Sequence, residues 1–118
     1  MNVQCRRSGP CLIVQLSGEM DHHASDTARR KIDDAYLLQG ALHIIFDCHH
    51  LDFMDSSGLG LIMGRYKTAA SLGGRVVLVG ITPKLDRIFS LSGLYKIIQK
   101  APSTAEAVQL LEGGRQYV

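Results

Sequence analysis

The chain has 118 residues, 46% of them hydrophobic, and a formal charge of +2; this length suits one domain with its own core. No apolar run approaches the roughly 20 residues that cross a bilayer, and the cations are scattered apart from residues 29–31. The three cysteines are an odd number, which favours reduced thiols in a cytoplasmic protein. We therefore expect a single cytoplasmic domain over residues 1–118 that binds neither membranes nor nucleic acid.

The first residues predict a hairpin. Two segments rich in β-formers, 2–7 and 11–17, are separated by Ser8-Gly9-Pro10, a run typical of a tight connection. If Ser8-Gly9 forms the turn, Cys11 lies opposite Arg6 in the paired strands.

Strand and helix patterns alternate after the hairpin. Apolar residues at helical spacing predict a helix over 24–35 that ends at Gly40, and 43–48 is a short apolar run typical of a buried strand. The helix after the next loop has one apolar stripe, consisting of Leu59, Ile62, Met63, Tyr66 and Ala70. The remaining elements are a strand at 75–79, a helix capped by Thr82-Pro83, a short strand at Ile97-Ile98 and a helix with a capping box at Ser103-Glu106.

This alternation predicts an α/β fold. Strands joined through helices form a mostly parallel sheet with right-handed crossovers, and the hairpin contributes an antiparallel strand near one edge. About four helices accompany the sheet. No linker divides the chain, and we expect a frayed tail over residues 113–118.

The most informative segment is residues 53–60, which contains two hydroxyls at the predicted junction between a strand and a helix. A phosphate added there would meet the free amide groups of the first helical turn. Asp21 and Asp55 each follow a strand-like run and precede a helix, so both can lie at the same carboxyl-end rim of the sheet. The alternative is that each carboxylate simply caps its helix.

Three glycines, Gly58, Gly60 and Gly64, lie in this helix, where each costs about 1 kcal/mol relative to alanine. They match neither nucleotide-binding fingerprint. They either allow close packing of the helix on the sheet, or keep its first turns bare so that another protein can approach Ser57. We favour the second interpretation.

A serine hydrolase is a less favoured alternative. The Gly-x-Ser-x-Gly pattern fails, because Met54 and Asp55 occupy the position of its first glycine. Histidines in or beside predicted loops leave a Ser-His pair open; they are His22, His23, His49 and His50.

A metal site is also disfavoured. Cys48, His49 and His50 have the right chemistry for zinc, but adjacent residues seldom chelate one ion well. We interpret them as surface histidines that flank a buried cysteine. We therefore expect this chain to bind no metal and no cofactor and to have no catalytic residue.

Four segments resemble the STAS-domain anti-anti-sigma factors: 16–23, 53–60, 63–67 and 92–98. The motif Asp55-Ser56-Ser57-Gly58 alone indicates the wider family. The segments 21–23 and 64–67 are more specifically similar to its sporulation members, which antagonise the anti-sigma F factor.

The resemblance implies a switch protein that is not an enzyme. Its unmodified form binds an anti-sigma factor, itself an ATP-dependent serine kinase, and so releases the sigma factor. The kinase phosphorylates Ser57, and a dedicated serine phosphatase reverses the modification. The partner surface is expected to consist of Asp21, Asp55, Ser56, Ser57, Gly58 and Gly60. A STAS module of a general stress or nucleotide-sensing pathway is the alternative within the family.

Overall fold

The structure, a computed structural model, describes residues 2–113. Its strands are β1 (Asn2–Ser8), β2 (Cys11–Met20), β3 (His43–Met54), β4 (Val76–Val79) and β5 (Gln99–Ala101). Its helices are α1 (His22–Leu38), α2 (Ser56–Ser71), α3 (Pro83–Ser92), the short 3₁₀ turn η1 (Leu94–Lys96) and α4 (Thr104–Gly113). The tail predicted from Gly113 lies outside the described residues, apart from Gly113 itself, which ends α4.

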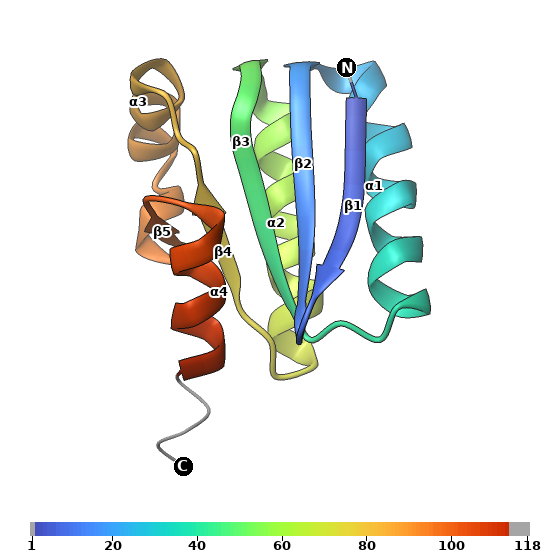
Figure 1. The fold of residues 1–118 in the computed structure, drawn as a ribbon. Coiled ribbons are helices and arrows are strands. Elements are labelled where there is room, and N and C mark those ends of the chain that lie inside the picture. Colours follow the sequence, from blue (N-terminus) through green and yellow to red (C-terminus); the bar gives the residue numbers. More distant parts are fainter. Residues whose placement is uncertain (1, 114–118) are drawn as a thin grey trace.

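The five strands form one sheet in the order β1-β2-β3-β4-β5. β1 is antiparallel to β2 and every other pair is parallel, which confirms the predicted fold class. Figure 1 shows α1 and α2 on one face of the sheet and α4 on the other. The main core, which includes Ile32, Phe46 and Phe89, lies under α1, α2 and α3, and a smaller cluster lies under α4.

The hairpin turn differs from the prediction by one residue. Cys11 pairs with Ser8, and Arg6 pairs with Ile13, so the connection consists of Gly9 and Pro10. Gly9 has φ +56°, a conformation that glycine adopts without a steric penalty. The predicted pairing of Cys11 with Arg6 is therefore wrong, because the positive φ places Gly9 at the first turn position rather than the second.

β3 is twice as long as the predicted strand. It continues to Met54 because β2 also continues and pairs with it through Ser17–His50 and Met20–Met54, with two irregularities in register. Within the extension, Leu51 and Met54 are buried, whereas the polar residues around them are exposed. Because polar residues interrupt the apolar ones, the sequence of this extension predicted a loop. The consequence is that β2 and β3 end side by side at the same edge of the sheet.

The buried face of α2 and the start of the last strand also differ from the prediction. The buried face of α2 consists of Gly58, Leu61, Ile62, Arg65 and Ala69, so the helix is rotated relative to the predicted stripe. The last strand begins at Gln99, just after Ile97-Ile98, because η1 occupies the preceding residues. The predicted N-caps are confirmed: Thr82 Oγ1 accepts from the Leu85 amide at 3.4 Å, and Ser103 Oγ accepts from the Glu106 amide at 3.2 Å. Among the described residues, the return bond of the capping box, from the Ser103 amide to the Glu106 carboxylate, is not formed.

Candidate functional site

Asp21 and Asp55 lie together at the carboxyl edge of the sheet, as predicted. They follow Met20 and Met54, which are paired across β2 and β3, and the Asp55 amide donates to the Met20 carbonyl at 3.4 Å. Each carboxylate is also a helix cap. Asp21 Oδ1 accepts from the Ala24 amide at 2.9 Å, and Asp55 Oδ1 accepts from the amides of α2. Both interpretations of these residues therefore hold.

The first turn of α2 is not open to an anion in the way that the sequence suggested. Asp55 Oδ1 accepts from the amides of Ser57 at 2.9 Å and of Gly58 at 3.2 Å. The expectation of free amides at Ser57 and Gly58 is therefore wrong, because a carboxylate one residue before the helix already caps them. A phosphate on Ser57 would lie beside that carboxylate.

The Ser57 hydroxyl is half-buried at the second position of α2, and Ser56 beside it is exposed. Ser57 Oγ lies 3.1 Å from Nδ1 of His22, the first residue of α1. The hydroxyl is therefore held at the surface between the starts of two helices. The sequence left a Ser-His pair open but did not indicate which histidine would form it.

A groove of about 390 Å³ runs from this pair along α1 and α2. Its lining residues are His22, Ser25, Asp26, Arg29, Ser57, Gly60, Leu61, Gly64 and Arg65. Arg29 pairs with Asp26 at 3.6 Å, and the buried Arg65 pairs with Asp33 at 3.0 Å. Burial lowers the pKa of Arg65, while the Asp33 carboxylate raises it. Each arginine thus has a carboxylate beside it, although the buried Nη1 of Arg65 has no hydrogen-bond partner among the described residues.

The glycines of α2 divide between the two predicted roles. A Cβ at Gly58 would lie 2.4 Å from Met54 Cγ and 2.9 Å from Met20 Cγ, so Gly58 allows close packing of the helix on the sheet. A Cβ at Gly60 or Gly64 would meet nothing within 4 Å. These two glycines leave the floor of the groove bare.

This difference predicts opposite effects of alanine on stability. Gly58→Ala should lower the free energy of unfolding by about 1–3 kcal/mol, because the methyl group overpacks two buried methionines. Gly60→Ala should raise it by up to about 1 kcal/mol, because alanine is the better helix former. Urea unfolding of the two variants tests the pair. Equal effects of the two substitutions would contradict the packing role of Gly58.

The Ser57-His22 pair does not form the site of a serine hydrolase. Such a site needs a third group that orients the imidazole and donors for an oxyanion. Among the described residues, the His22 ring makes no hydrogen bond besides the one to Ser57. The amides of Ser57 and Gly58 are occupied by Asp55. The geometry provides a surface hydroxyl beside an imidazole, without the rest of the machinery.

The Cys48-His49-His50 segment does not converge on a single point. Cys48 is fully buried, and burial, assisted by the neighbouring Asp47 charge, raises its pKa to about 12. His49 and His50 are exposed. Within residues 2–113, no group of three or more His, Cys, Asp or Glu side chains is placed to hold a metal ion. In the same part of the chain, the helices are all too short or too polar to cross a membrane.

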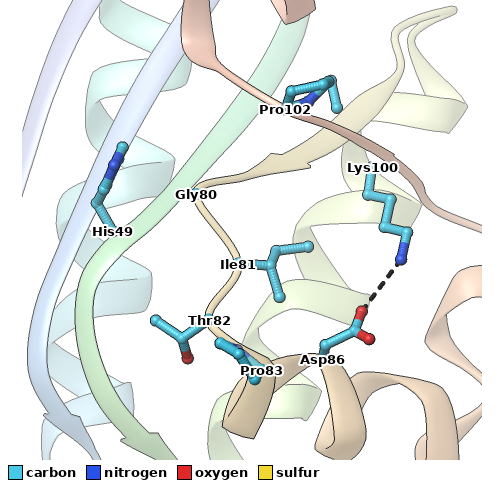
Figure 2. A pocket seen from close by; sticks show the side chains of 9 residues that line it. His49, Gly80, Ile81, Thr82, Pro83, Asp86, Lys100 and Pro102 are labelled. Atoms are coloured by element: carbon cyan, nitrogen blue, oxygen red, sulfur yellow. Dashed lines mark hydrogen bonds and ion pairs between the residues drawn. The ribbon is translucent and has the colours of Figure 1, made fainter.

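A larger hollow of about 770 Å³ lies at the loops that follow β4 and β5 (Figure 2). It is lined by His49, Gly80, Ile81, Thr82, Pro83, Asp86, Lys100, Ala101 and Pro102. Asp86 Oδ1 accepts from Tyr95 Oη at 2.6 Å and from Lys100 Nζ at 3.1 Å. No local sequence pattern indicates this hollow, because its lining comes from several elements and includes no motif.

The Tyr95-Asp86 contact predicts a pH dependence of stability. The hydrogen bond from Tyr95, followed by that from Lys100, lowers the pKa of Asp86. A lowered pKa in the folded state stabilises the protein above pH about 4, the ordinary value of an unfolded aspartate, and that contribution is lost as the pH falls through the folded value. The difference in unfolding free energy between the wild type and Tyr95→Phe should therefore shrink below pH about 4. Urea unfolding across that range tests this, and a constant difference would contradict it.

Comparisons with known proteins agree on one family. The STAS domain family matches residues 2–107. The anti-sigma F factor antagonist of Paenibacillus polymyxa is 43% identical over 86% of each chain. The unphosphorylated form of the anti-sigma factor antagonist SpoIIAA superposes with a TM-score of 0.82 at 33% identity, covering 95% of this chain and 97% of that one. The phosphorylated form of the Bacillus cell fate determinant SpoIIAA gives 0.72 at 33% identity, covering 92% and 97%.

Proposed function

The chain belongs to the STAS domain family, and we propose that it is an anti-sigma factor antagonist switched by phosphorylation of Ser57. The unmodified protein binds an anti-sigma factor serine kinase and releases the sigma factor. A phosphate on Ser57 blocks this binding, and a serine phosphatase restores it. The observation that carries the proposal is the Ser57 hydroxyl, held at the carboxyl rim of the sheet within reach of another protein.

The partner surface is built around that hydroxyl. Asp21, Ser56 and Gly60 are exposed beside it, and Asp55 is half-buried at the start of α2. Gly58 lies beneath this surface and holds α2 close to the sheet. A partner that docks on the bare turn at Gly60 comes close to Ser57 without meeting a side chain.

Phosphorylation changes this surface more than it changes the fold. It adds about −1.5 to −2 charges next to the carboxylates of Asp21 and Asp55. The helix start stays capped by Asp55, and the hydroxyl lies outside the core. Since like charges placed together at an interface cost several kcal/mol, the partner is repelled while the protein stays folded.

The comparisons support this role for the chain. A relative with 43% identity is an antagonist of the anti-sigma F factor, which favours the sporulation type over a general stress or nucleotide-sensing module. SpoIIAA, which is similar to this chain, has been solved in unphosphorylated and phosphorylated forms. Proteins of this kind are regulators rather than enzymes, so we propose that the chain acts by binding its partners in the cytoplasm.

Incubation with ATP and the cognate anti-sigma F kinase, followed by mass spectrometry, tests the proposal. We expect one added phosphate, located at Ser57, that appears only with the kinase and disappears on addition of the phosphatase. A protein that stays unmodified, or that carries its phosphate on another residue, would refute the assignment.

A further inference from the structure

The histidine beside Ser57 has no role in the switch described above. The α1 residue His22 and the α2 residue Ser57 are 35 positions apart in the chain, yet His22 Nδ1 lies 3.1 Å from Ser57 Oγ. His22 is exposed and does not contribute to the core. The contact therefore joins the starts of two helices at the site where the phosphate would be attached.

A phosphate on Ser57 would find few other partners. The amides of Ser57 and Gly58 donate to Asp55. Each arginine of the groove has a carboxylate beside it, Asp26 for Arg29 and Asp33 for Arg65, and the Arg65 Nη1 that lacks a hydrogen-bond partner is buried. Asp21 and Asp55, which cap the two helices, are negative and would repel the phosphate. The imidazole of His22 already contacts Ser57 Oγ, and it can donate a hydrogen bond and take up a positive charge.

We propose, on the basis of the function proposed above, that His22 is the intramolecular ligand of phosphoserine 57. In the unmodified protein the ring contacts the hydroxyl. When the phosphate is present, His22 binds a proton, and its Nδ1–H donates a charge-assisted hydrogen bond to a phosphate oxygen. The positive ring offsets the repulsion from the two aspartates and ties α1 to α2.

This contact would extend the effect of the modification to a second helix. His22 follows Asp21 directly, and both belong to the start of α1. Once the imidazolium holds the phosphate, the surface that the partner meets is changed at α1 as well as at α2. A cation at a helix N-terminus is ordinarily disfavoured, so the added phosphate is what makes the charged ring stable there.

The test uses the full chain with phosphoserine placed at position 57 during translation, so that no kinase is needed. The second pKa of the phosphate, ordinarily about 6, is measured by ³¹P NMR in the wild type, His22→Gln and His23→Gln. His23 is the matched control, because it is adjacent and also exposed. We expect this pKa to be higher by about one unit in His22→Gln than in the other two proteins.

The reciprocal effect is measured on the histidine. NMR titration of the His22 ring should show a higher pKa with the phosphate than without it, because the two groups interact. Phosphorylation should also lower the melting temperature more in His22→Gln than in His23→Gln, with the unphosphorylated forms as references. A phosphate pKa that is the same in all three proteins would overturn the inference.

The outcomes separate the two proposals. If the kinase does not label Ser57, the proposed function fails, but the NMR measurement on the translated phosphoprotein still tests the His22 contact. If the kinase labels Ser57 and the His22→Gln phosphate titrates like that of the wild type, the switch stands and His22 is not the ligand.

Discussion

A Ser57→Ala protein is expected to accept no phosphate from the anti-sigma kinase and to stay bound to it in the presence of ATP. The substitution removes the only proposed phosphate acceptor. It leaves the cap of α2 intact, because Asp55 accepts from the amides of residues 57 and 58 rather than from the side chain. The expected result is complete loss of labelling, measured by mass spectrometry, with retained binding in a pull-down.

Ser56→Ala is the matched control for this variant. Ser56 is the neighbouring hydroxyl, exposed at the first position of α2, and its substitution should leave labelling at Ser57. Persistent labelling of Ser57→Ala, or loss of labelling in Ser56→Ala alone, would mean that the wrong serine has been assigned.

The second large effect is expected from a fixed charge. Ser57→Asp should weaken binding to the kinase by about 100-fold, which corresponds to about 2.7 kcal/mol, because a third carboxylate joins Asp21 and Asp55 at the proposed partner surface. Its fold should be retained, as judged by circular dichroism. Calorimetric titration of the kinase measures the affinity.

Ser56→Asp separates position from charge. It adds the same charge one residue away. His22 contacts the side chain of Ser57 and not that of Ser56. The loss of affinity should be clearly smaller than for Ser57→Asp. If Ser56→Asp and Ser57→Asp weakened binding equally, general charge repulsion would explain the effect, and position 57 would not be specifically required.

Local signals predicted the fold class and several elements. β4 is a short run of apolar β-formers, and α3 begins where Thr82 and Pro83 indicate a cap and a first helical residue. The end of β3 was not predictable in this way. The exposed residues of this end follow no regular alternation. The strand continues there because it pairs with β2, which is far away in the sequence.

The buried face of α2 shows the same limit. Gly58 carries no hydrophobic signal, but it is buried because two methionines lie against it. Arg65 reads as a surface residue, but Asp33 of α1 pairs with it. Tertiary contacts rather than periodicity determined which residues of the helix face inward.

At the site, the sequence placed Asp21 and Asp55 at one rim, because strands of a parallel sheet end at the same edge. That the amides of Ser57 and Gly58 donate to the Asp55 carboxylate was only one of two possibilities consistent with the sequence. The contact between His22 and Ser57 depends on how α1 and α2 pack side by side. No local pattern encodes that distance.

The most direct test of the switch is the affinity of the anti-sigma kinase for the same protein with and without phosphate on Ser57, measured by calorimetric titration. The account predicts tight binding of the unmodified form and a loss of at least about 100-fold on phosphorylation. Equal affinities for the two forms, with both folded, would contradict it.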